Sequence, residues 1–189
     1  MGKIQNYRKY ESSHSNWPLA FLYPENWTVR ELVERGSIEI FIAGPRDETG
    51  AAVASITVLG EKGKDKPLKQ YVEDYINRFR SLNGFNLIAR TEGSLNGYEA
   101  EEVEITYTMP LPLESINARP TPIRERRIFF KKGECLYELI YSAAEENYFT
   151  YLFAFQTLVR TLSTGKQEES YYPLILSLPS VKVSVPKAG

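Results

Sequence analysis

The chain carries one cysteine and one histidine, Cys135 and His14, the smallest set that could provide a thiol nucleophile and its base. The pattern does not bring them together, since Cys135 begins a strand-like run and His14 lies among serines near the N-terminus. A free cysteine is most often a small buried hydrophobic residue. A single histidine also leaves a zinc site short of its usual ligands. We therefore predict a protein that is not an enzyme, with no catalytic residue and no bound cofactor.

Acidic side chains at two places are candidates for binding calcium. Asp47 and Glu48 share a turn-rich segment, and Glu102 and Glu104 alternate along an extended run. Calcium takes six or more oxygen ligands, usually from a curved loop, so the two strand carboxylates would need ligands from elsewhere. The alternative, which we favour, is that they pair with arginines of a neighbouring strand, each pair contributing roughly 0.2–1 kcal/mol.

The first candidate for binding a partner is an irregular, proline-bearing loop predicted between residues 109 and 127. About 15 residues of irregular chain is longer than an ordinary connection, and such loops are usually functional or disordered. Arginine is enriched in protein interfaces and binds carboxylates in a fork. The alternative is a solvated loop whose arginines pair with the Glu-rich strand. The candidate partner-binding residues here are Arg119, Arg124, Arg126 and Arg127.

The second candidate for binding a partner is Phe149 with Phe153. These two residues widen the apolar arc of a predicted helix beyond what one buried face requires. If no other part of the chain covers them, they form an exposed aromatic patch that marks a partner site. The alternative, which we favour, is that the C-terminal tail packs there through Tyr171 and Tyr172, so that the phenylalanines belong to the core.

The charge balance excludes one class of partner. Lys and Arg number 23 and Asp and Glu number 24, a net charge of -1, whereas nucleic-acid-binding proteins usually show a basic excess. No apolar run approaches the ~20 residues of a membrane helix. The N-terminus lacks an export signal, which predicts a cytoplasmic protein as the sequence stands. An export signal ahead of Met1 would instead place the protein outside the cytoplasm.

Apolar periodicity predicts the elements that position these residues. Alternating runs predict an N-terminal antiparallel meander of four strands, at 17–23, 27–32, 37–43 and 52–59. Later extended runs, with a turn at Asn96-Gly97, predict strands at 85–91, 98–108, 124–132 and 136–143. Helical spacing predicts helices at 68–82 and 145–162. Ser142 and Glu145 form a capping box at the start of the second helix.

The segment Phe21-Leu22-Tyr23-Pro24-Glu25-Asn26-Trp27 predicts a strand, a tight turn and the start of a second strand. Pro24 and Asn26 shape the turn, and the aromatic residues belong to the core or its rim. This segment and the order of elements resemble the PsbP-like superfamily over residues 17–162. That group includes the PsbP extrinsic subunit of photosystem II, its bacterial and cyanobacterial relatives, a yeast Ran-binding nucleotide-release protein and DcrB-type envelope lipoproteins. The runs at 133–139 and 155–159 add to the resemblance.

The resemblance implies an α+β fold, in which a twisted antiparallel sheet is covered by helices on both faces (an α/β/α sandwich). We expect a polar N-terminal segment at 1–16, a PsbP-like domain at 17–164 and a proline-containing tail at 165–189. The resemblance also implies a binding or assembly-support protein, whose partner is another protein or a membrane-associated complex such as photosystem II. Calcium as a cofactor is implied by the resemblance alone. The alternative function is a carrier or sensor that holds a small apolar ligand between helix and sheet.

Overall fold

A seven-stranded antiparallel sheet organises the structure, a computed structural model that describes residues 6–48, 50–112, 116 and 118–165. The strands lie in the order β3-β4-β5-β9-β8-β7-β6, and β1 and β2 form a separate two-stranded sheet. The strands are β1 (Tyr7–Glu11), β2 (Ala20–Pro24), β3 (Thr28–Glu34), β4 (Ser37–Ala43), β5 (Ala54–Glu61), β6 (Asn86–Leu95), β7 (Tyr98–Leu111), β8 (Arg119–Lys132) and β9 (Cys135–Ala144). The helices are α1 (Leu68–Phe79), a 3₁₀ turn (Glu145–Asn147) and α2 (Tyr148–Thr161).

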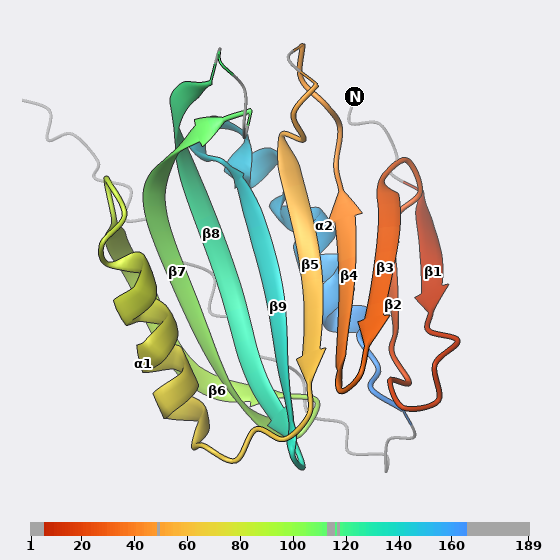
Figure 1. Cartoon of the computed structure of the whole chain (residues 1–189). Helices are drawn as coiled ribbons and strands as arrows, with labels where there is room; N and C mark the ends of the chain where they lie inside the picture. The colour runs from red at the N-terminus through yellow and green to blue at the C-terminus, as the bar shows by residue number, and fades with distance from the viewer. Residues whose placement is uncertain (1–5, 49, 113–115, 117, 166–189) are drawn as a thin grey trace, which may run out of the picture.

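The two helices lie on opposite faces of the large sheet (Figure 1). The first helix, α1, packs on β7 and β8, whereas α2 packs on β9 and β5 together with the β1–β2 hairpin. This arrangement confirms the predicted α+β fold with helices on both faces. Within the part of the chain that the structure describes, it also leaves part of the sheet without a helix, because α1 covers only one side of its face in Figure 1.

Side-chain alternation decides which face each strand buries. On β4, Ile38, Ile40 and Ile42 all point toward α2 and are at most 1% exposed. On the opposite face, Val72 of α1 packs in one cluster with Val103 of β7, and both are fully buried. Two separate cores thus hold the two helices, one on each side of the sheet.

Gly60 of β5 allows a tryptophan to lie directly on the sheet. A Cβ atom at this position would come within 2.6 Å of the Trp17 ring and 3.0 Å of the Ile38 side chain. Trp17 is 2% exposed and makes an edge-to-face contact with Tyr137, with ring centroids 5.9 Å apart. Glycine is therefore required here by close packing.

Gly60→Ala is expected to lower the free energy of unfolding by about 1–3 kcal/mol, because the added methyl group overpacks the core. The matched control is Gly93→Ala on β6, where a Cβ atom would meet nothing within 4 Å. The control should change stability by less than about 0.5 kcal/mol. Urea denaturation of both variants checks this, and equal stabilities would contradict the packing argument.

The predicted four-strand meander at the N-terminus is wrong in its first member. Only β3, β4 and β5 form a meander in the large sheet, while β2 pairs with β1. Phe21 of β2 is 1% exposed in the α2-side core, and the Leu22 amide donates a hydrogen bond to Thr161 Oγ1 of α2. The strand is thus held by the helix. Its turn matches the prediction, since the Trp27 amide donates to the Pro24 carbonyl at 3.0 Å and Trp27 is 4% exposed.

The predicted irregular loop over 109–127 is also wrong, because most of it is strand. β7 continues to Leu111 and β8 begins at Arg119, so the connection covers only 112–118, of which 113–115 and 117 lie outside the described residues. Pro110 pairs with Pro120 in this extension. The pairing of β6 with β7 ends at Thr106 of β7, and the pairing of β9 with β8 ends at Ile123 of β8. In the extension beyond these residues, β7 and β8 therefore have only each other as neighbours. Proline is tolerated where a strand lacks a second hydrogen-bonding partner.

Both helices are shorter than predicted. The first helix ends at Phe79, three residues before Leu82, which is 39% exposed in the following turn. The capping box at the second helix is wrong, because Ser142 is still inside β9 and pairs with Ser55 and Glu125. A 3₁₀ turn follows β9, and α2 begins only at Tyr148, with no side-chain cap.

Candidate functional site

The strand geometry separates the four arginines that the sequence placed in one loop. Arg126 and Arg127 are consecutive on β8, so their side chains point to opposite faces of the sheet. Arg124 and Arg126 share the α2 face, and Arg119 is exposed at the far end of the strand. A single cluster of all four is therefore excluded by the alternation of the strand.

The two arginines on the α2 face form cross-strand ion pairs with the calcium candidates of β7. Arg124 pairs with Glu104 and Arg126 with Glu102, each at 2.5 Å between nitrogen and oxygen. This is the alternative that the sequence favoured. Asp47 lies in the turn between β4 and β5, where its carboxylate accepts a hydrogen bond from the Ala51 amide at 3.1 Å.

No metal centre is formed by the part of the chain that the structure describes. Glu48 lies in the same turn as Asp47, apart from the β7 pair of glutamates. Among the described residues, no three His, Cys, Asp or Glu side chains come together as metal ligands would. Calcium binding by Asp47, Glu48, Glu102 and Glu104 thus has no geometry to support it.

One surface brings the two predicted partner sites together. The Arg124 guanidinium lies over the rings of Tyr148 and Phe149, 4.6 Å and 5.0 Å from their centroids. Phe149 is 66% exposed, and Phe153, one turn further along α2, is 56% exposed. With Arg126 beside it on β8, we define the arginine–aromatic surface as Arg124, Arg126, Tyr148, Phe149 and Phe153. The tail residues Tyr171 and Tyr172 lie outside the described residues.

The inner edge of the arginine–aromatic surface contains polar groups in a largely apolar setting. Arg126 Nε is buried without a hydrogen-bond partner in the described part of the chain. Burial raises the pKa of the Tyr148 hydroxyl well above its ordinary value, and the nearby Glu104 carboxylate adds to the shift. A buried donor without a partner costs about 1–3 kcal/mol, so this surface holds an unused donor next to its exposed rings.

Arg127 instead belongs to a buried network beneath α1. Glu125, 4% exposed, accepts hydrogen bonds from the hydroxyls of Tyr75 at 2.8 Å and Tyr107 at 3.0 Å. Arg127 pairs with Glu125 at 2.8 Å and with Glu138 at 2.7 Å. The prediction that Arg127 binds a partner therefore has no support from its position, because its charge is already neutralised on both sides and its side chain is 13% exposed.

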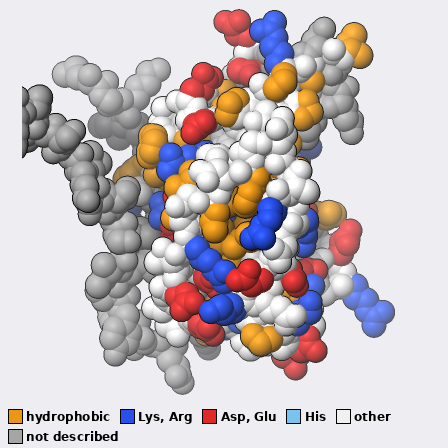
Figure 2. Space-filling model, turned by 90° about the vertical axis from the view of Figure 1, so that its left-hand side faces the viewer, with side chains coloured by type: hydrophobic (Ala, Val, Ile, Leu, Met, Phe, Trp, Pro, Cys, Tyr) orange, Lys and Arg blue, Asp and Glu red, His pale blue; other side chains and the backbone are white. Residues whose placement is uncertain are grey.

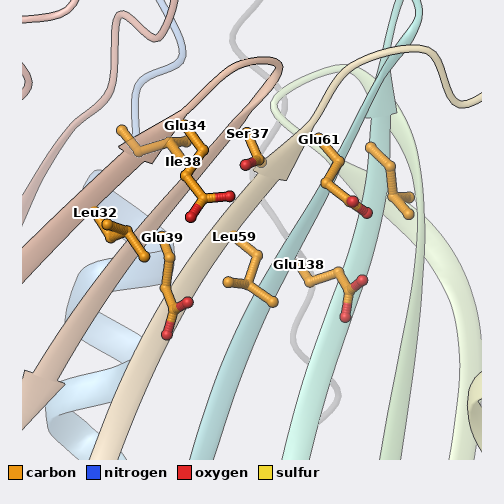
Figure 3. Close-up of a pocket in the computed structure, with 10 residues that line it drawn as sticks. Leu32, Glu34, Ser37, Ile38, Glu39, Leu59, Glu61 and Glu138 are labelled. Atoms are coloured by element: carbon orange, nitrogen blue, oxygen red, sulfur yellow. The ribbon is translucent and has the colours of Figure 1, made fainter.

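A shallow depression of about 320 Å³ lies on the half of the sheet that α1 leaves uncovered (Figure 3). The sequence did not indicate it as a site. A signal was present, since Glu39 and Phe41 occupy the face of β4 opposite the isoleucines, and a mixed second face is typical of a sheet side without a covering element. The side chains that line it are Leu32, Glu34, Ser37, Glu39, Leu59, Glu61, Leu136 and Glu138.

The side of the molecule that carries α1 and β6 is shown in Figure 2, where hydrophobic side chains gather between charged ones. Leu87 and Ile88, at the start of β6, are 41% and 40% exposed. β6 is an edge strand, but a register shift between Leu87 and Ala89 interrupts it. Bulges and charged residues such as Arg90 discourage the addition of another strand.

The candidate nucleophile and base do not meet. His14 lies in the loop between β1 and β2, and its Nε2 atom is 3.0 Å from a carboxylate oxygen of Glu31 on β3. Cys135 is half-buried at the start of β9 and packs against the α2-side core. Neither arrangement activates a thiol. No helix within residues 6–48, 50–112, 116 and 118–165 is long and apolar enough to cross a bilayer.

Comparison with known proteins identifies the fold. No family model matches the chain, and no curated protein matches it in sequence. Solved structures do match it: LpqN of Mycobacterium tuberculosis, described as involved in cell envelope biogenesis, has a TM-score of 0.55 at 12% identity, over 85% of this chain and 91% of its own. Cyanobacterial PsbP (CyanoP) of Synechocystis has a TM-score of 0.51 at 17% identity, over 87% of this chain and 96% of its own. The chain has the PsbP-like fold.

The Ran-binding protein Mog1p of Saccharomyces cerevisiae has the same fold, with a TM-score of 0.51 at 11% identity over 85% of this chain and 96% of its own. The resemblance read from the sequence is thus confirmed for the fold. A PsbP-like fold is compatible with non-enzymatic protein binding, as the description of Mog1p illustrates. At these identities the likeness carries no residue roles, because function belongs to sites and not to folds.

Proposed function

We propose that this PsbP-like protein is a non-enzymatic binding protein that supports the assembly of a protein complex through its arginine–aromatic surface. The observation that carries the proposal is the stacking of Arg124 on Tyr148 and on the exposed Phe149, with the exposed Phe153 one turn further along α2. Aromatic residues and arginine dominate the binding energy of protein interfaces. The partner we expect is another protein that presents an apolar surface to Phe149 and Phe153.

The geometry favours a protein partner over a small molecule. The phenylalanines lie on the outer side of α2, on a convex helix surface, whereas small ligands bind in concave sites. The interfaces of α1 and α2 with the sheet are filled by buried side chains such as Val72 and Phe155. The alternative function, a carrier of a small apolar ligand between helix and sheet, therefore receives less support.

Phe149→Ser combined with Phe153→Ser is expected to abolish partner binding and to leave the fold intact, because both side chains are largely exposed. The measurement is photo-crosslinking in cells that express the protein natively, with the crosslinker at position 150, followed by mass spectrometry. We expect the crosslinked protein to decrease at least about tenfold, as for the loss of an interface hot spot. Urea denaturation should show a stability change below about 1 kcal/mol.

The matched control for this experiment is Leu82→Ser combined with Leu87→Ser, which removes two exposed apolar side chains on the α1–β6 side. The control should keep the crosslinked partner. If both double variants capture the same protein to the same extent, the arginine–aromatic surface is not the binding site.

A further inference from the structure

We infer that the uncovered half of the α1-side sheet face is a second interface, and that its occupant is an amphipathic helix of a partner protein with lysine or arginine along its flanks. We define the acidic sheet face as the side chains of β3, β4, β5 and β9 around the depression in Figure 3. This surface lies on the opposite side of the sheet from the arginine–aromatic surface. Its existence does not depend on the proposed function.

One half of this sheet face lacks a covering helix among the described residues (Figure 1). On the same face of the sheet, α1 buries Val103 and Ile105 of β7 completely with its own apolar stripe. Next to it, no helix of the described residues covers β9, β5, β4 and β3 on this side (Figure 1). These four strands span about 14 Å at the usual strand spacing. One helix, about 10 Å across with its side chains, fits this width beside α1.

Leucine and glutamate side chains alternate across the acidic sheet face. Across neighbouring strands, Leu32 lies beside Glu39, Glu39 beside Leu59, and Leu59 beside Glu138. Leu32 is 55% exposed, a large apolar side chain left in water on the edge strand β3. Leucines flanked by carboxylates complement a helix whose apolar stripe is bordered by lysines.

The acidic sheet face carries negative charge. Four glutamates, and neither lysine nor arginine, line the depression. Glu61 is paired with Lys64 and Glu138 with Arg127, whereas the exposed Glu34 and Glu39 have no ion-pair partner within the described residues. Two free carboxylates next to apolar surface favour a cationic partner and disfavour like charges.

The same charges argue against two other occupants. A second copy of this chain docked through the same face would bring its carboxylates against those of the first copy. An anionic lipid surface would be repelled for the same reason. Arg30, on the same face of β3, lies opposite Phe41 and outside the depression.

The test uses the full chain and a synthetic peptide of about 18 residues, roughly 27 Å long as a helix. The peptide contains leucine and lysine only, placed so that the leucines form one face. Fluorescence anisotropy should show saturable binding that weakens with salt. A shuffled peptide of the same composition, which has no apolar face, should bind at least about tenfold more weakly because it cannot bury its leucines together.

Two variants test the charge and apolar parts of the face separately. Glu34→Lys combined with Glu39→Lys should weaken binding of the amphipathic peptide at least about tenfold. Leu32→Ser should weaken it about fivefold or more through lost apolar burial. The matched control, Glu99→Lys combined with Glu134→Lys, makes the same charge change at exposed positions at the start of β7 and in the turn between β8 and β9, and should alter binding less than about twofold.

Equal binding of the shuffled and amphipathic peptides would overturn the inference, and so would unchanged binding by Glu34→Lys/Glu39→Lys. Sedimentation of the wild-type chain provides a further check, because self-association that these two substitutions remove would make a second copy the occupant. Phe149→Ser/Phe153→Ser should bind the peptide like the wild type. The second interface and the proposed function can therefore fail independently.

Discussion

Above pH 10 the protein is expected to unfold cooperatively, with the midpoint of unfolding at about pH 11. Burial raises the pKa of five core tyrosines, that of Tyr137 to about 12 and those of the others further. Unfolded tyrosine has a pKa of about 10. The other four are Tyr75, Tyr107, Tyr141 and Tyr148.

The direction of this effect follows from where the protons are held. Between the unfolded and the folded pKa, the unfolded chain loses tyrosine protons that the folded chain keeps. The stabilisation is therefore complete below about pH 10 and is lost as the pH rises. Each tyrosine contributes about 1.4 kcal/mol per pH unit, so five together remove about 7 kcal/mol by pH 11. A protein of this size has a total stability of about 5–15 kcal/mol.

Circular dichroism and phenolate absorbance, followed together against pH, measure this unfolding. Loss of structure and ionisation of the buried tyrosines should occur at the same pH. In Tyr137→Phe, one titrating group is removed, so the midpoint should move upward. Ionisation of all tyrosines near pH 10 with the circular dichroism unchanged would show that the five hydroxyls are not buried as described.

Glu125→Ala is expected to lower the free energy of unfolding by about 3–5 kcal/mol, because it breaks a buried ion pair on one side only. The Tyr75 and Tyr107 hydroxyls lose their acceptor, and Arg127 keeps only Glu138. The cationic guanidinium would then lie over the Tyr75 ring, 4.3 Å from its centroid, without the Glu125 carboxylate. Urea denaturation monitored by circular dichroism measures the loss.

Two comparison variants separate the contribution of the network from that of a single carboxylate. Glu102→Ala removes a partly exposed glutamate on the other face of the sheet and should cost about 1 kcal/mol or less. Glu125→Leu combined with Arg127→Met removes both charges and should recover much of the lost stability. A loss below about 1 kcal/mol in Glu125→Ala would mean that the network contributes little to the fold.

Hydrophobic periodicity was sufficient to predict most of the fold, because local spacing decides whether a segment is helix or strand. The two helices and the strands of the large sheet were found at nearly their observed positions, and the turn at Asn96-Gly97 was confirmed, with φ of 53° and 79°. The order of elements together with the segment Phe21–Trp27 indicated the PsbP-like fold. The pairing partner of each strand was harder to predict. Strand β2 has the same alternation of side chains as the strands that follow it, yet it pairs with β1 and packs on α2.

The candidate sites were harder to predict, because they depend on what covers each face. Four prolines between 110 and 122 predicted a loop, although three of them lie in β7 and β8, where each strand has a single neighbour. Because that segment was predicted to be a loop, the alternation of side chains along a strand, which places Arg126 and Arg127 on opposite faces, was not taken into account. The contact of Arg124 with Phe149 could not be anticipated, since it joins a strand to a helix that follows two elements later.

The order of the sheet has a consequence for how the chain reaches its native state. β3, β4 and β5 form one meander of sequential hairpins, and β6 to β9 form another. The two meet only where β5 pairs with β9, and there Ala54 lies opposite Ala143, nearly half the chain away. Each meander can form through contacts that are local in sequence. Pairing β5 with β9 instead requires closing a loop that contains all the residues between them, and this costs conformational entropy. The slow step of folding is therefore expected at one seam in the middle of the sheet.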